Sequence, residues 1–106
     1  MFGKSCNISP QEAKKMMEQT EKHVLLDVRT PAEYREIRIS GAKLLPVDEL
    51  GARAAKELPD KDELILIYCR SGARASAALK TLTAMGYTNV YNFGGIMNWP
   101  YETVRG

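Results

Sequence analysis

Cys69 has the sequence surroundings of a reactive nucleophile. It follows the run 64–68, which is apolar at every position, as expected of a buried parallel strand. The stretch 73–85 that comes after it predicts a helix. A cysteine between two such elements faces unpaired backbone N–H groups and the positive end of the helix dipole, and both stabilise negative charge on sulfur. The alternative is a buried structural cysteine, which suits the polar residues after Cys69 less well.

The position of the single histidine narrows the chemistry that Cys69 could perform. His23 comes just before the predicted strand 24–28, so we expect it at the opposite edge of the sheet, roughly 15 Å from Cys69 over some five strand residues. A cysteine–histidine hydrolase needs its base within hydrogen-bond reach of the nucleophile. Attack on a sulfur atom needs a thiolate and a good leaving group but no histidine. Sulfur transfer therefore fits these residues.

Other polar and glycine residues follow the predicted strands and so belong at the same edge of the sheet. Asp27 and Arg29 end the strand 24–28, and Gly94 and Gly95 follow the strand 90–92. Ligands of open parallel sheets bind outside the carboxyl ends of the strands, so these residues could border one crevice with Cys69. For Asp27 and Arg29 we favour a structural ion pair over a direct catalytic role.

Strand-like and helix-like segments alternate along the chain, which predicts an α/β domain with a mostly parallel sheet. A capping box, Ser9 to Glu12, begins the first helix at Pro10. We expect a turn at 93–95 and loose packing at 100–106. The other predicted elements are a short helix from Pro31, a brief strand at 44–45 and a helix at 47–58, besides the strands 24–28, 64–68 and 90–92 and the helix 73–85.

The composition is that of an ordinary globular chain. Hydrophobic residues make up 44% and charged residues 26%, and we expect one domain over residues 1–106. The formal charge of +2 is too small to indicate nucleic acid or an anionic membrane as a partner. No run approaches the ~18 apolar residues of a membrane span, and residues 1–10 lack the core of a secretory signal. We therefore expect a cytoplasmic protein.

The second cysteine, Cys6, lies in a polar N-terminal stretch of a kind that often frays, so the sequence does not predict a structural disulfide. We interpret Cys6 as an incidental residue. The functional alternative is a thiol that resolves an oxidised Cys69.

Several motifs, in this order, resemble those of the single-domain rhodanese, or thiosulfate sulfurtransferase-like, family over nearly the whole chain. Cys69-Arg70-Ser71-Gly72-Ala73-Arg74 resembles the six-residue catalytic loop of that family. Ile37 and Arg38 depart from the family pattern, because many relatives carry glycine and histidine there. The other matching motifs are Leu26-Asp27-Val28-Arg29 with Pro31, Glu33 and Tyr34, then Ile39-Ser40-Gly41-Ala42-Lys43-Leu44-Leu45-Pro46, and finally Gly94-Gly95 with Trp99.

The resemblance implies a rhodanese-like three-layer α/β fold, with helices on both faces of a mostly parallel central sheet. It also implies that Cys69 takes a sulfane sulfur from a small anionic donor, thiosulfate or a persulfide, and so forms a persulfide itself. A thiophilic acceptor then removes the sulfur; cyanide and thiols, including protein thiols, are the acceptors implied. No metal, nucleotide or flavin cofactor is expected, because the chain shows no ligand cluster and no dinucleotide fingerprint.

Each loop residue has an expected role within this resemblance. Successive N–H groups from Arg70 to Arg74 would form an anion-binding nest around the sulfur, and glycine at Gly72 permits the required backbone angles. We expect Arg70 to point into the crevice and attract the donor. Arg74 either binds the donor or anchors the loop through a carboxylate such as Asp27, and we favour anchoring. Ser71 either donates a hydrogen bond to the persulfide or stabilises the turn. Tyr68 and Trp99 are expected to supply apolar walls.

Two other classes of protein remain open at this point. Cysteine phosphatases and arsenate reductases use a related loop with arginine six positions after the nucleophile, where this chain has Ala75. Arginine at the fifth position, Arg74, makes the loop one residue shorter and better suited to a sulfur atom than to a phosphate. The third class is a non-enzymatic binding or regulatory module on the same fold, against which the intact Cys69 argues.

Overall fold

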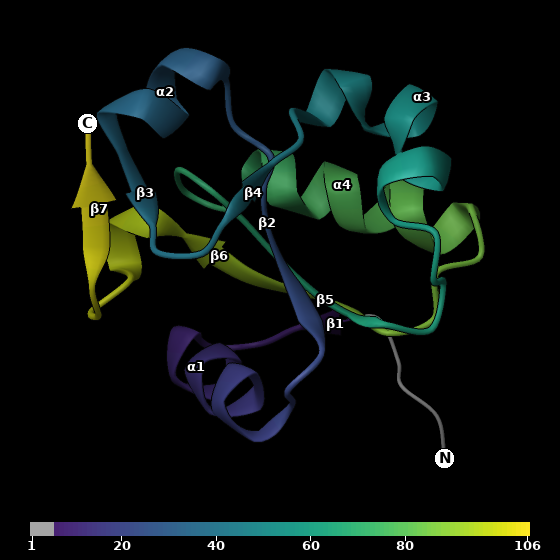
Figure 1. Cartoon of the computed structure of the whole chain (residues 1–106), viewed down its shortest axis with the longest axis horizontal. Coiled ribbons are helices and arrows are strands. Elements are labelled where there is room, and N and C mark those ends of the chain that lie inside the picture. Colours follow the sequence, from purple (N-terminus) through teal and green to yellow (C-terminus); the bar gives the residue numbers. More distant parts are fainter. Residues whose placement is uncertain (1–5) are drawn as a thin grey trace.

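A five-stranded, entirely parallel sheet lies at the centre of the molecule. The computed structural model describes residues 6–106 (Figure 1). The strand order is β1-β6-β5-β2-β4, and this confirms the predicted parallel sheet. The strands of this sheet are β1 (Cys6–Asn7), β6 (Val90–Gly95), β5 (Leu64–Cys69), β2 (His23–Asp27) and β4 (Lys43–Leu44).

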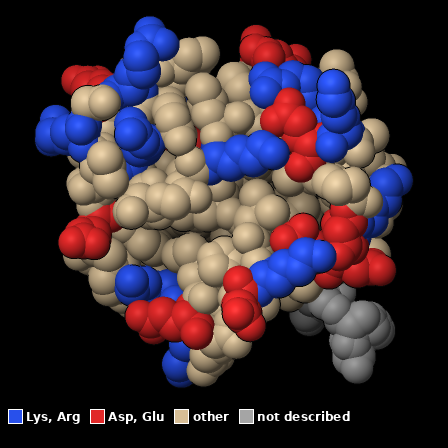
Figure 2. All heavy atoms as spheres, viewed as in Figure 1, with Lys and Arg blue, Asp and Glu red and all other residues tan. Residues whose placement is uncertain are grey.

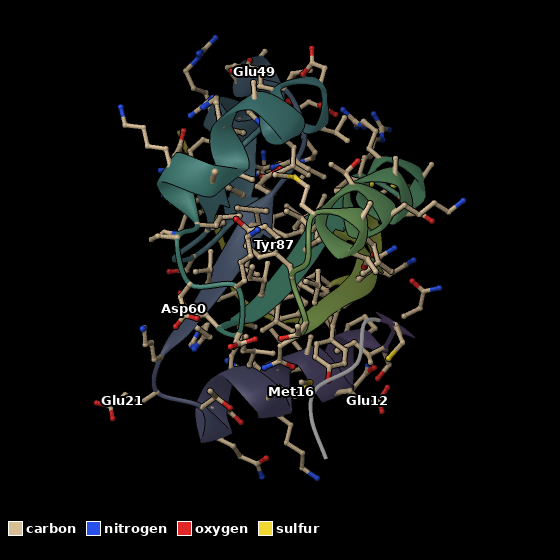
Figure 3. All side chains as sticks on the ribbon, turned by 90° about the vertical axis from the view of Figure 1, so that its right-hand side faces the viewer. Glu12, Met16, Glu21, Glu49, Asp60 and Tyr87 are labelled. Carbon is tan, nitrogen blue, oxygen red and sulfur yellow. The ribbon has the colours of Figure 1, made fainter. Side chains whose placement is uncertain are left out.

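Helices cover both faces of this sheet. Helix α1 (Pro10–Gln19) packs on one face, and α3 (Val47–Glu57) and α4 (Ala73–Ala84) pack on the other, as Figure 3 shows from the side. Strand β5 is buried at all six positions, because its side chains alternate between two apolar layers. Ile65 and Ile67 belong to the layer under α3 and α4, whereas Leu64, Leu66 and Tyr68 belong to the layer over α1. The predicted three-layer arrangement is confirmed.

Local sequence signals explain where two helices begin. At α1 the Ser9 side chain accepts a hydrogen bond from the Glu12 amide, and the Glu12 carboxylate accepts one from the Ser9 amide. The same reciprocal capping box starts α2 (Pro31–Glu36), with Thr30 and Glu33 in the two positions. Both helices carry proline at their first position, where no backbone donor is needed. The capping box of α2 fixes Glu33 on the side of the helix that meets the candidate site.

A second, two-stranded sheet joins the middle of the chain to its last residues. Strand β3 (Ile37–Ile39) pairs in antiparallel fashion with β7 (Thr103–Arg105), which follows the 3-10 turn η1 (Ile96–Asn98). The prediction of loose packing at 100–106 is therefore wrong for 103–105. Neither strand has enough residues to give a sequence pattern of its own, so the pairing depends on tertiary contacts that bring the two segments together.

Three further expectations are corrected by the structure. The expected turn at 93–95 is the end of β6, which continues through Gly95. Cys6 does not fray but pairs with Tyr91 at the sheet edge. Helix 47–58 ends at Glu57, and helix 73–85 ends at Ala84. Within residues 6–106, no helix has the length and apolar character needed to cross a bilayer.

Candidate active site

Cys69 is the last residue of β5, and the chain turns back over its side chain. Gly72 has a φ of 114°, a conformation that favours glycine, and α4 begins at the next residue. This turn brings the Gly72 amide close to the Cys69 Sγ atom, to which it donates a hydrogen bond of 2.9 Å. The exposed fraction of Cys69 is 1%. The sulfur is therefore enclosed by the loop at the N-terminal end of α4.

Strand β6 holds the loop from the other side through its two glycines. A Cβ atom on Gly95 would lie 2.0 Å from the Arg70 carbonyl oxygen and 2.6 Å from the Ser71 Cα atom. The Cβ position of Gly72 lies 3.5 Å from the Cα atom of Gly94. The loop backbone thus packs directly on the strand backbone, which requires glycine at Gly95.

Asn92, to which no sequence pattern pointed, also shapes this contact. Between the pairs Ile67–Asn92 and Cys69–Gly95, β6 contains one residue more than β5, so the register shifts. The buried Asn92 side chain accepts a hydrogen bond of 2.8 Å from the Gly94 amide. Its amide group donates to the Gly72 carbonyl oxygen at 3.5 Å. Asn92 therefore joins the irregular strand to the loop.

Arg74 anchors the loop, but its partner is Glu33 rather than Asp27. Two parallel hydrogen bonds, of 2.7 and 3.0 Å, join its guanidinium to the Glu33 carboxylate. These bonds are the main reason why the pKa of Glu33 falls to about 2. The same bonds are the main cause that raises the pKa of Arg74, and negative charge on Cys69 acts in the same direction. Arg74 therefore lies within electrostatic reach of the sulfur.

Asp27 and Arg29 form the buried ion pair that the sequence predicts. The Arg29 guanidinium donates to both carboxylate oxygens of Asp27, with the shortest contact at 2.6 Å. The Tyr68 hydroxyl donates to the same carboxylate at 2.7 Å. Burial is the main cause that raises the pKa of Tyr68, so its hydroxyl keeps its proton. Burial by itself would lower the pKa of Arg29, but the hydrogen bonds to Asp27 and the charge of that carboxylate outweigh it, so the pKa is raised.

This buried network also fixes the position of β3. Arg29 donates a 2.6 Å hydrogen bond to the Ile37 carbonyl oxygen, and the Ile39 amide donates to the Tyr68 hydroxyl at 3.1 Å. No buried side-chain nitrogen or oxygen atom within residues 6–106 lacks a hydrogen-bond partner, as burial requires. Asp27 and Arg29 accordingly position the segments around the site, which agrees with a structural ion pair.

A pocket of about 300 Å³ opens beside the loop, and Arg70 lines it as expected. Tyr68 and Trp99 do not form its walls, because both are buried in the core layer over α1. The apolar walls come instead from Ile37, Ile96 and Met97. The lining residues are Arg29, Glu33, Glu36, Ile37, Arg70, Ile96, Met97 and Arg105.

The remaining loop residues lie at the surface, and His23 lies far from them. Ser71 is exposed, and Ala73 is the exposed first residue of α4. His23 pairs with Leu64, at the far end of β5 from Cys69, and it contacts the Thr20 carbonyl oxygen. The expectation that it lies at the opposite edge is confirmed.

Cys6 lies two strands away from β5, with its register partner on β6 level with Leu66. Two strand spacings and three residues along β5 separate it from Cys69 by roughly 14 Å. Both thiols are free. In the described part of the chain, no group of three or more histidine, cysteine, aspartate or glutamate side chains could hold a metal ion.

Comparison with known proteins identifies relatives over most of the chain. The family model described as Rhodanese-like domain matches residues 9–101. The thiosulfate sulfurtransferase PspE of Escherichia coli (strain K12) is 36% identical over 81 residues, which are 76% of this chain and 78% of the relative. A sulfurtransferase of Allochromatium vinosum is 40% identical over 93 residues, or 87% of this chain and 85% of the relative.

A solved structure shows the same fold. The rhodanese of E. coli determined with anions superposes with a TM-score of 0.74 at 34% identity. The match covers 79% of this chain and 99% of that chain.

Proposed function

The chain belongs to the rhodanese-like family of sulfurtransferases, and we propose that it moves a sulfane sulfur from an anionic donor through a persulfide on Cys69. The observation that carries this proposal is the placement of the Cys69 Sγ atom. It accepts the Gly72 amide hydrogen bond at the N-terminal end of α4, where backbone N–H groups and the helix dipole favour negative charge.

In the first step the Cys69 thiolate attacks the outer sulfur of the donor. With thiosulfate a new S–S bond forms to Cys69, the S–S bond of thiosulfate breaks, and sulfite leaves with the electron pair. Thiosulfate is proposed as a donor because the name of the relative PspE states it. The loop N–H groups from Arg70 to Arg74 stabilise the charge that the persulfide retains. Arg70, at the pocket, attracts the anion.

In the second step a thiophilic acceptor takes the outer sulfur from Cys69. Cyanide attacks this sulfur and leaves as thiocyanate, and the electron pair of the S–S bond returns to Cys69 as thiolate. A thiol acceptor follows the same course and becomes a persulfide. Neither step needs a proton delivered to a poor leaving group, which is consistent with a site far from His23.

A phosphatase or arsenate reductase is the weaker alternative. The guanidinium of Arg74 is occupied by two hydrogen bonds to Glu33, and the sixth position of the loop is Ala75, a buried residue of α4. The fifth and sixth positions after Cys69 therefore offer no free arginine to bind a tetrahedral phosphate. A non-enzymatic binding module is tested directly by the experiment below.

Intact-protein mass spectrometry after thiosulfate treatment, before and after cyanide, tests the proposal. We expect the wild-type chain to gain one sulfur atom and to lose it with cyanide. Cys69→Ser should gain none. Cys6→Ser is the matched control, because the second thiol lies two strands away, and it should behave as wild type. If the wild-type chain gained no sulfur atom from thiosulfate or from persulfide donors, the proposal would be overturned and a binding module favoured.

A further inference from the structure

The pocket beside the loop is larger than thiosulfate requires. Its volume of about 300 Å³ corresponds to roughly ten water molecules at ~30 Å³ each. Thiosulfate has only five non-hydrogen atoms and would leave much of this space empty. Cys69 is 1% exposed and does not itself line the pocket, so a donor bound there has to extend its terminal sulfur past Arg70 into the loop. The size of the pocket therefore points to a donor with an organic group.

Two arginines of the pocket are available to a ligand. Arg29 is already paired with Asp27, and Glu33 with Arg74. Arg70 and Arg105 are exposed and take part in no ion pair within residues 6–106. Figure 2 shows positively charged side chains over α2 and the neighbouring β7, with acidic ones among them. The pocket thus has two unpaired cations, Arg70 beside Cys69 and Arg105 on β7, against one carboxylate without an ion pair in residues 6–106, Glu36.

The register of β3 and β7 sets the direction of Arg105. Arg105 pairs with Ile37, so their side chains lie on the same face of the two-stranded sheet, and both line the pocket. Strand β3 is in turn held by the hydrogen bond from Arg29 to the Ile37 carbonyl oxygen. The position of Arg105 is therefore built into the fold through the buried ion pair.

Apolar side chains line the same pocket as the two arginines. Ile37 and Ile96 are half-buried, and Met97 is 65% exposed. The Met97 amide donates a 3.3 Å hydrogen bond to the Arg70 carbonyl oxygen, which ties this wall to the loop. An aliphatic chain with a terminal anionic group matches the combination of apolar wall and arginine.

We propose that Arg105 is a specificity-determining residue that binds the carboxylate of an organic persulfide donor, while the aliphatic part of the donor lies on Ile37, Ile96 and Met97. This inference rests on the proposed sulfurtransferase function and extends it to a class of donor. Arg105 acts on the organic group, whereas Arg70 acts on any anionic donor next to Cys69.

The reaction with such a donor balances without a further reactant. The Cys69 thiolate attacks the outer sulfur of R–S–SH. A new S–S bond forms between Cys69 and this outer sulfur, and the S–S bond within the donor breaks. The proton stays on the transferred sulfur, and R–S⁻ leaves with the electron pair. Nothing is oxidised or reduced overall, because one persulfide replaces another.

The test compares donors that differ only in the carboxylate. The rate of Cys69 persulfidation is measured with thiosulfate, with the persulfide of mercaptopropionate, and with the persulfide of its methyl ester. For Arg105→Gln we expect kcat/KM to fall about fivefold to tenfold with the carboxylate donor, as for loss of one charge-assisted contact. It should stay within about twofold for the ester and for thiosulfate. Arg70→Ala should raise the KM for thiosulfate as well.

Two control variants complete the test. Arg35→Gln removes one exposed positive charge from α2 without touching the pocket, and it should leave the ratio between the carboxylate donor and the ester unchanged. Arg105→Lys keeps the charge and should retain part of the preference. If Arg105→Gln lowered kcat/KM equally with all three donors, or with none of them, the proposed role of Arg105 would be overturned. Absence of Cys69 persulfidation with every donor would instead overturn the proposed function.

Discussion

At the scale of the residue, Glu33 has two structural tasks. Its carboxylate accepts the Thr30 amide in the capping box of α2, and it accepts both hydrogen bonds from Arg74 of the active-site loop. One side chain therefore links the start of α2 to the start of α4. Thr30 and Glu33 have the spacing of a capping box, but the second partner of Glu33, Arg74, lies 41 residues away.

The pH dependence of stability should reveal this link. The pKa of Glu33 lies near 2 in the folded state, below its ordinary 4.5, so the charged form contributes stability above about pH 4.5. That contribution is lost as the pH falls from 4.5 towards 2. Glu33→Gln should therefore lower the free energy of unfolding at pH 7, by about 1 kcal/mol because solvent screens this partly exposed pair.

Urea unfolding of wild type and Glu33→Gln between pH 2 and 7 measures this effect. The difference between the two proteins should shrink below pH 4.5 and nearly vanish near pH 2. Glu21→Gln, at an exposed glutamate that Figure 3 shows pointing away from the fold, is the matched control and should give no such trend. A difference that is constant across this range would contradict the assigned ion pair.

At the scale of the element, the loop after β5 depends on the backbone of β6. The Arg70 carbonyl group and Ser71 Cα atom occupy the space where a side chain of Gly95 would lie. The N-terminal end of α4 and the sulfur are thus positioned by Gly95, which comes more than 20 residues later in the sequence.

Gly95→Ala should displace the loop. A Cβ atom 2.0 Å from the Arg70 carbonyl oxygen cannot be accommodated without backbone movement, for which we expect a loss of about 1–3 kcal/mol in stability. The rate of sulfur transfer should fall by more than the loss of stability explains, because the Gly72 amide would move away from the Cys69 Sγ atom. Thermal unfolding and the rate of Cys69 persulfidation measure the two effects.

Gly51→Ala is the matched control for this substitution. Gly51 lies in α3 and has no heavy atom within 4 Å of its Cβ position, so alanine should stabilise the helix by about 0.5–1 kcal/mol. Its activity should equal that of wild type. If Gly95→Ala behaved in the same way, the close contact between the loop and β6 would be refuted.

At the scale of the whole molecule, a buried polar network connects the central sheet to the peripheral one. Asp27 and Tyr68 belong to β2 and β5, and they hold β3 through Arg29 and through the Tyr68 hydroxyl. Strand β3 in turn carries β7, and with it Arg105 of the pocket. The network therefore positions one wall of the pocket.

Tyr68→Phe should loosen this connection. Removing the hydroxyl leaves the Ile39 amide without its partner and takes one of three hydrogen bonds from the Asp27 Oδ2 atom, at a cost of about 1–3 kcal/mol. We expect faster amide hydrogen exchange at Ile39 and in β7, measured by NMR, beyond what the change in global stability explains.

Tyr87→Phe is the control for this variant. Tyr87 is also buried and donates to the carbonyl oxygens of Ala54 and Leu58, in α3 and directly after it. It should lower global stability without a selective effect on β3 and β7. Equal exchange patterns in the two variants would show that Tyr68 does not hold the peripheral sheet.

The sequence by itself determined the features that depend on neighbours along the chain. The apolar run 64–68, Gly72 and the helix that follows it placed Cys69 at a strand-to-helix turn, and the alternation of segments determined the parallel α/β class. These patterns reflect backbone geometry and burial over a few residues. The ion pair of Asp27 and Arg29 was also predictable, because its members are two residues apart.

Only the tertiary structure decided which distant groups meet. Several carboxylates could have paired with Arg74, and the choice of Glu33 follows from how α2 packs beside the loop. The pairing of β3 with β7, which brings Arg105 to the pocket, follows from a buried network rather than from a pattern in three-residue strands. Contacts between residues far apart in sequence depend on the packing of the whole chain, so short-range patterns do not specify them.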